Sequence, residues 1–152
     1  LKGARWVLPP EQFWWIRDEL EHYPDQPTIV AVHYPALPIP QRLRRPELRD
    51  GGALENGADL LDLLAQYPQV RAIFSGHLHL HFIECHGDIH QIVTGALPEY
   101  PVEYRLVEVG ETFLDISTKG LSDPSFASRS LLPGKHWTHG EARDRAARIR
   151  LR

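Results

Sequence analysis

Three histidines at alternate positions follow an apolar run in the middle of this 152-residue chain. The run Ala72-Ile73-Phe74 stops at Ser75-Gly76, and His77, His79 and His81 come next. In an extended backbone these three side chains would point to one face, with neighbours roughly 7 Å apart. Neutral imidazole binds first-row divalent metals well. The alternation therefore predicts a metal-binding strand face; the alternative is a polar strand face that is merely rich in histidine.

A fourth histidine stands in a similar place. The β-branched and apolar run at residues 28–32 is typical of a strand buried on both faces of a layered α/β domain, and it ends at His33. Residues 69–75 predict a second buried strand. Because ligands in open α/β sheets bind beyond the carboxyl ends of the strands, two strands would bring histidines to one edge of the sheet. Taken alone, His33 is more often a structural residue.

The remaining pattern changes character along the chain. Residues 11–22 predict an amphipathic helix after Pro9-Pro10, and Asn56 predicts the N-cap of a second, leucine-rich helix that ends near Tyr67-Pro68. Two hairpins are then expected, residues 80–85 with 89–94 around Gly87-Asp88, and 102–109 with 112–117 around Gly110-Glu111. Residues 118–140 are predicted to be irregular. Residues 141–152 are predicted to form either a short helix or an edge strand. The predicted class is α/β (α+β).

A long loop at residues 35–52 is rich in proline and arginine. Long loops inside compact domains are often functional. Its arginines could attract an anionic substrate through bidentate contacts, or could simply be solvated. The arginines are Arg42, Arg44, Arg45 and Arg49.

Composition excludes several classes of function. The net charge of −3, with both signs interspersed, predicts no nucleic-acid binding. No apolar run approaches the roughly 20 residues of a membrane-spanning helix. The single cysteine, Cys85, excludes an internal disulfide and leaves the compartment open, with any N-terminal targeting region outside the chain. With no methionine present, Leu1 is not a translated start, so we expect a processed product or a piece of a longer polypeptide.

The order of these features resembles the C-terminal half of the calcineurin-like metallophosphoesterases. The matching residues are Gly3, Gln12, Trp15, His33, Asn56 and the element Gly76-His77-Leu78-His79. The most specific part is the isolated His33 after one strand, followed by Gly-His-x-His after another. The resemblance covers roughly residues 1–117 and extends to the tail at 137–145. It implies that residues 1–120 are the C-terminal part of a metallophosphoesterase domain, and that 121–152 are an irregular segment and arginine-rich tail of the same domain.

The resemblance also implies a fold and a chemistry. The fold is a β sandwich flanked by helices, with two divalent metal ions (Fe, Mn, Zn or Co) at the strand ends. His33 and His77 match ligands of one ion and His79 a ligand of the other, whereas His81 lies outside the motif. Two such metals clamp a phosphate ester and activate the hydroxide that attacks phosphorus. The expected function is hydrolysis of phosphomonoesters or phosphodiesters.

The family's earlier motifs are absent from this sequence. These are Asp-x-His, Gly-Asp and Gly-Asn-His, which carry the carboxylates, the Asn ligand and the catalytic histidine of the family. We therefore expect a missing N-terminal half of the same domain as a partner, and little activity from this chain alone. Two alternatives stay open: a non-catalytic binding or regulatory domain that keeps the fold, and a mononuclear zinc site made by three histidines.

Overall fold

The structure is a computed structural model that describes residues 6–45 and 52–151. Gly3 and Arg49, which figure in the sequence interpretation, lie outside the described residues. The helices are α1 (Pro10–His22), α2 (Gly57–Leu64) and α3 (Ser125–Ser130), with short 3-10 turns at Gln41–Leu43, His136–His139 and Ala142–Asp144. The strands are β1 (Thr28–Ala31), β2 (Val70–Ser75), β3 (Phe82–His86), β4 (Ile89–Val93), β5 (Glu103–Val109), β6 (Phe113–Gly120) and β7 (Ala146–Arg150).

The strands of the described residues form two sheets. The first has the order β1-β2-β4-β3, in which β1, β2 and β4 are parallel and β3 is antiparallel to β4. The second is the antiparallel sheet β5-β6-β7. Both predicted hairpins, β3-β4 and β5-β6, are confirmed. The tail that sequence left undecided forms the edge strand β7 beside β6.

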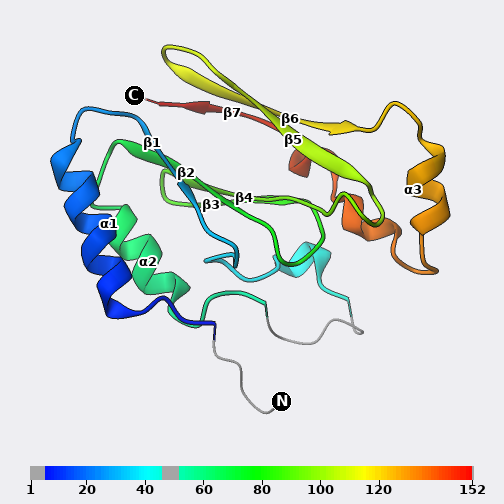
Figure 1. Cartoon of the computed structure of the whole chain (residues 1–152), viewed down its shortest axis with the longest axis horizontal. Helices are drawn as coiled ribbons and strands as arrows, with labels where there is room; N and C mark the ends of the chain where they lie inside the picture. The colour runs from blue at the N-terminus through cyan, green and yellow to red at the C-terminus, as the bar shows by residue number, and fades with distance from the viewer. Residues whose placement is uncertain (1–5, 46–51, 152) are drawn as a thin grey trace.

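The two sheets and the helices form three layers (Figure 1): α1 and α2 cover one face of the first sheet, and the second sheet covers the other. Core residues on the helix side include Leu60, Leu64 and Ile73. Between the sheets, Ala72 and Ile92 pack against Leu114, Ile116 and Ile149. This is the predicted mixed α/β sandwich flanked by helices.

One strand prediction is wrong in part. The run at residues 28–32 was expected to be buried on both faces, yet Ile29 is 41% exposed and Ala31 is also exposed. The cause is position, because β1 is the edge strand of its sheet and pairs only with β2 in the described chain. Its apolar residues therefore border an open edge.

No helix in the described ranges is long and apolar enough to cross a bilayer.

Candidate metal centre

His33 and His77 meet at the carboxyl ends of β1 and β2. The two strands are parallel neighbours, and the Gly76 N–H donates to the His33 carbonyl at 3.1 Å just past their ends. The His33 Nε2 and His77 Nδ1 atoms lie 3.3 Å apart. The structure thus brings together the two histidines that the resemblance assigns to one metal ion.

The segment that carries the three alternate histidines is not a strand. It is an irregular connection between β2 and β3, and both His77 (φ 61°) and His79 (φ 54°) adopt the left-handed conformation. The expected extended face with a regular 7 Å spacing is therefore wrong. Non-glycine residues in this region carry strain and are concentrated at functional sites. The bends let the successive histidines make different contacts.

Aromatic rings surround His77. Tyr34 lies 4.3 Å from it between ring centroids and stacks on Trp6 at 4.4 Å, and Trp6 itself is 5.7 Å from His77. Burial among these rings, with His33 and His79 nearby, lowers the pKa of His77. His77 is therefore a neutral imidazole at pH 7, the form that ligates metals. Sequence reasoning missed Trp6 and Tyr34, although Tyr34 directly follows His33.

His79 faces a different partner. Its Nδ1 atom lies 2.5 Å from Oε1 of Glu99, which is carried by the loop between β4 and β5. Sequence reasoning did not single out Glu99. A small cavity of about 60 Å³ opens beside the pair and is lined in part by Tyr100, Lys135 and Trp137. His79 thus lies beside the centre without joining the His33–His77 contact.

His81, unassigned from sequence, is completely buried. Its Nδ1 accepts the Gly95 N–H at 3.1 Å, and its Nε2 lies 3.3 Å from Oε2 of Glu103, too poorly aligned for a good hydrogen bond. Burial, followed by the charges of Arg105 and Arg145, lowers the pKa of His81 to about 3. His81 is a neutral residue of the interior.

Two of the loop arginines in the described residues, Arg42 and Arg45, contact side chains other than the histidines. Arg42 makes a bidentate ion pair with the buried Asp144, at 2.7 Å for both contacts, and a further one with Glu84 at 2.7 Å. Arg45 lies over the ring of Trp137 at 6.0 Å. Arg42 therefore joins the loop to β3 and to the turn before β7, which is a structural role.

Asn56 precedes α2, as predicted, but it does not cap the helix with its side chain. Its amide instead makes two hydrogen bonds to Leu8, accepting from the N–H at 3.0 Å and donating to the carbonyl at 2.9 Å. It therefore fixes the segment that carries Trp6. The other residues of the resemblance, Gln12 and Trp15, line a separate apolar groove between α1 and β1.

The donor set fits half of a metal centre. Two imidazole nitrogens on one tetrahedral ion, each about 2.0–2.1 Å from it, would be about 3.3 Å apart, which is the separation of the His33 and His77 nitrogens. Without a metal, the same separation suits a hydrogen bond between the rings. Within residues 6–45 and 52–151, no group of three or more His, Cys, Asp or Glu side chains is arranged to hold an ion.

Part of this chain is similar in sequence to known phosphodiesterases. It is 30% identical over 78 residues to a 3′,5′-cyclic-nucleotide phosphodiesterase of Nostoc sp., covering 51% of this chain and 27% of the relative. It is 37% identical over 65 residues to the glycerophosphodiester phosphodiesterase GpdQ of Enterobacter lignolyticus, covering 43% of this chain and 22% of that relative. No family model matches. A dimetal phosphatase from Danio rerio superposes with a TM-score of 0.63 and 14% identity, covering 95% of this chain and 39% of that one.

The comparisons give a shared fold with one phosphatase and partial sequence similarity to two phosphodiesterases. The chain has the fold of the zebrafish phosphatase over nearly all of its length, and its sequence relatives are named as phosphodiesterases. It spans about a quarter of the length of these curated relatives.

Proposed function

We propose that this chain is the C-terminal part of a metal-dependent phosphoesterase, and that His33 and His77 ligate one divalent ion while His79 ligates a second. The observation that carries the proposal is the 3.3 Å separation of His33 Nε2 and His77 Nδ1 at the ends of two parallel strands. Bound metals would polarise the phosphate ester and lower the pKa of the attacking water. The contribution of this chain is to hold the imidazoles in place, with His77 beside the rings of Trp6 and Tyr34.

The names of the relatives favour phosphodiesters over monoesters as substrates. Both act on diesters according to their names. We therefore expect bis(p-nitrophenyl) phosphate to be hydrolysed faster than p-nitrophenyl phosphate.

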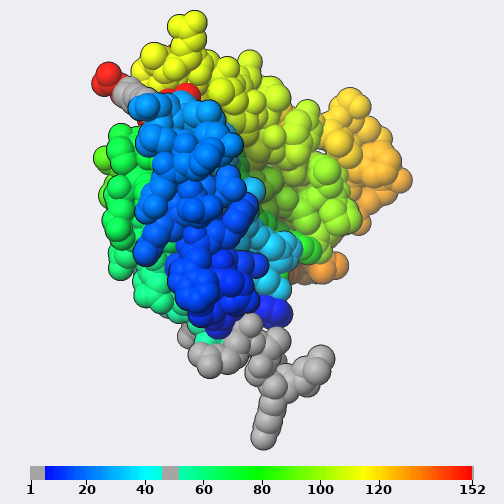
Figure 2. All heavy atoms as spheres, turned by 60° about the vertical axis from the view of Figure 1, so that its left-hand side comes forward, coloured from blue at the N-terminus to red at the C-terminus, as the bar shows by residue number. Residues whose placement is uncertain are grey.

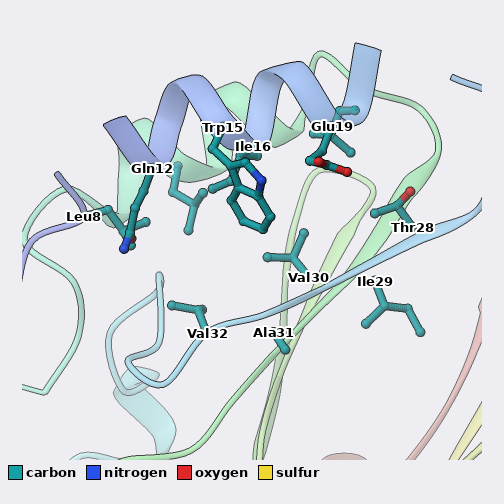
Figure 3. Close-up of a pocket in the computed structure, with 12 residues that line it drawn as sticks. Leu8, Gln12, Trp15, Ile16, Glu19, Thr28, Ile29, Val30, Ala31 and Val32 are labelled. Atoms are coloured by element: carbon teal, nitrogen blue, oxygen red, sulfur yellow. The ribbon is translucent and has the colours of Figure 1, made fainter. Parts of the chain in front are cut away.

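The rest of the domain has a place to dock. The edge strand β1 and helix α1 border an apolar groove, where Trp15 and Ile16 reach from the helix towards Val30 of the strand (Figure 3). In Figure 2, α1 lies on the outside of this face of the molecule. An edge strand presents unpaired N–H and C=O groups to a further strand. We assign this edge to the missing N-terminal half of the same domain, which would also supply the carboxylate ligands.

The test is metal content and turnover of the natural polypeptide that contains this chain. We expect His77→Ala to remove about one equivalent of metal and most of the diesterase activity. The matched control is His86→Ala, since His86 lies at the end of β3 with its side chain 44% exposed and its Nε2 atom 3.8 Å from Oδ1 of Asp62. Equal metal content and equal rates in wild type and His77→Ala would contradict the proposal and favour a non-catalytic domain.

A further inference from the structure

The loop between β4 and β5 carries a carboxylate to His79. Glu99 lies 20 positions after His79, yet its Oε1 is 2.5 Å from His79 Nδ1. In the neutral imidazole one nitrogen donates and the other accepts, so an Nδ1–H donated to Glu99 leaves the lone pair on Nε2. Metal-ligating histidines commonly donate their second ring N–H to a carboxylate, which fixes both the tautomer and the ring orientation.

The same loop contacts the histidine segment near both of its ends. At its start, Gly95 donates its N–H to Nδ1 of His81 at 3.1 Å. At its end, Glu103 lies 3.3 Å from Nε2 of His81 and forms a two-contact ion pair with Arg145, at 2.5 and 3.0 Å. His81 is therefore a brace: one completely buried ring touches the residues on either side of the loop that carries Glu99.

Close packing makes this brace specific. A Cβ added at Gly95 would lie 3.0 Å from Nε2 of His81, so the loop passes directly over the imidazole. The backbone N–H of His81 donates a hydrogen bond to the Thr138 carbonyl at 2.9 Å. Because these contacts are buried, the position of the loop relative to His79 is determined by packing and not by the exposed Glu99 contact alone.

We propose that Glu99 is a positioning residue that selects the Nδ1–H tautomer of His79 and presents its Nε2 to a metal ion, with His81 holding the Glu99 loop in register. This inference rests on the proposed function for the metal, whereas the tautomer is a property of the protein alone. The three alternate histidines then have separate tasks: His77 with His33 at one ion, His79 at the second, and His81 as support.

The test is nitrogen-15 NMR of the histidine rings in the metal-free natural polypeptide at pH 8, followed by titration with Mn²⁺ or Zn²⁺. We expect Nδ1–H for His79 in wild type and a shift towards Nε2–H in Glu99→Ala, with metal affinity lowered about 10–100-fold at one site. Glu99→Gln, whose amide oxygen can still accept the Nδ1–H, should recover part of that loss. The control Glu111→Ala, at the exposed β5-β6 turn, should change neither the His79 tautomer nor the metal affinity.

Unchanged tautomer and affinity in Glu99→Ala would overturn the inference while leaving the proposed function intact. Failure of the wild type to bind metal would overturn the proposed function, and the tautomer would still decide the role of Glu99. For the brace, His81→Ala should reproduce the His79 tautomer shift with Glu99 present. Should that variant not fold, His81→Leu, which fills part of the space but offers no acceptor to Gly95, replaces it. A folded His81 variant that loses the Gly95 hydrogen bond and keeps the wild-type His79 tautomer would overturn the bracing role.

Discussion

The Nε2 atom of His33 lies 3.3 Å from the Nδ1 atom of His77, although the two residues are 44 positions apart in sequence. Parallel pairing of β1 with β2 causes the contact, because it places both strand ends at the same edge of the sheet. Burial lowers the pKa of His77, so this ring is uncharged at neutral pH. Two imidazoles facing each other at this separation are the strongest indication of metal chemistry in the part of the chain that the structure describes.

The first prediction concerns the energetic coupling of these two rings. We expect His33→Ala and His77→Ala each to abolish most of the Zn²⁺ affinity at one site, and the double variant to be hardly worse than either single one. Two ligands of the same ion act as a unit, so their effects are not additive. Isothermal titration calorimetry of the natural polypeptide measures the Zn²⁺ affinity of the wild type, the two single variants and the double variant. Additive losses would place the two histidines at different ions.

The second prediction concerns Gly57, at the start of α2. A Cβ there would lie 2.1 Å from the backbone carbonyl oxygen of Ala36, which cannot rotate away. Helix propensity favours alanine over glycine by about 1 kcal/mol, but overpacking costs roughly 1–3 kcal/mol. We expect Gly57→Ala to lower the free energy of unfolding, measured by urea denaturation. Gly120→Ala is the control, because its Cβ would meet nothing within 4 Å, and equal stability of the two variants would contradict the packing argument.

A third prediction follows from the buried carboxylate of Asp144. Burial disfavours its ionised form, but hydrogen bonds from Arg42 and from the N–H groups of Ile83 and Glu141 outweigh this and lower its pKa. The native state therefore binds fewer protons than the unfolded state just below the unfolded pKa of about 3.9. The stability contributed by Asp144 is complete above that pH and is lost as pH falls through the lowered pKa.

The variant Asp144→Asn should therefore lower the free energy of unfolding by about 3 kcal/mol at pH 7, because it leaves the Arg42 charge without its buried partner. The difference from wild type should shrink as the pH falls below 4. Urea denaturation at pH 7 and at pH 3 measures both values. Glu84→Gln is the control, since its side chain is 35% exposed and its ion pair should contribute less than about 1 kcal/mol. A pH-independent cost of Asp144→Asn would exclude the ionic explanation.

The last prediction concerns the open edge of the first sheet. Ile29 is 41% exposed on the edge strand β1, and Trp15 is 61% exposed beside it on α1. We expect the isolated 152-residue chain to self-associate through this edge, and Ile29→Lys to reduce the association, because charged residues on edge strands oppose pairing. Size-exclusion chromatography over a concentration series is the measurement. Val109→Lys, which alters an equally apolar and 71% exposed site on the β5-β6 hairpin, should have no effect.

Much of the fold was predictable from local pattern. The helix periodicity at residues 11–22, the apolar runs of β2 and β4, and the turn residues Gly87-Asp88 each act over a few neighbouring positions, and the structure confirms all of them. The burial of β1 was not predictable, because an apolar run looks the same at the centre and at the edge of a sheet. Strand order depends on contacts between residues far apart in the chain.

The sequence alone determined which residue types stand at the strand ends, since His33, His77 and His79 follow apolar runs that can only be strands or buried helix. Only the tertiary structure decided what each histidine does. Left-handed backbone at His77 and His79 breaks the expected alternation, so His77 turns to His33, His79 to Glu99 and His81 into the interior. The partners Glu99, Trp6 and Tyr34 have no signature of their own, because their proximity to the histidines arises from packing between distant segments.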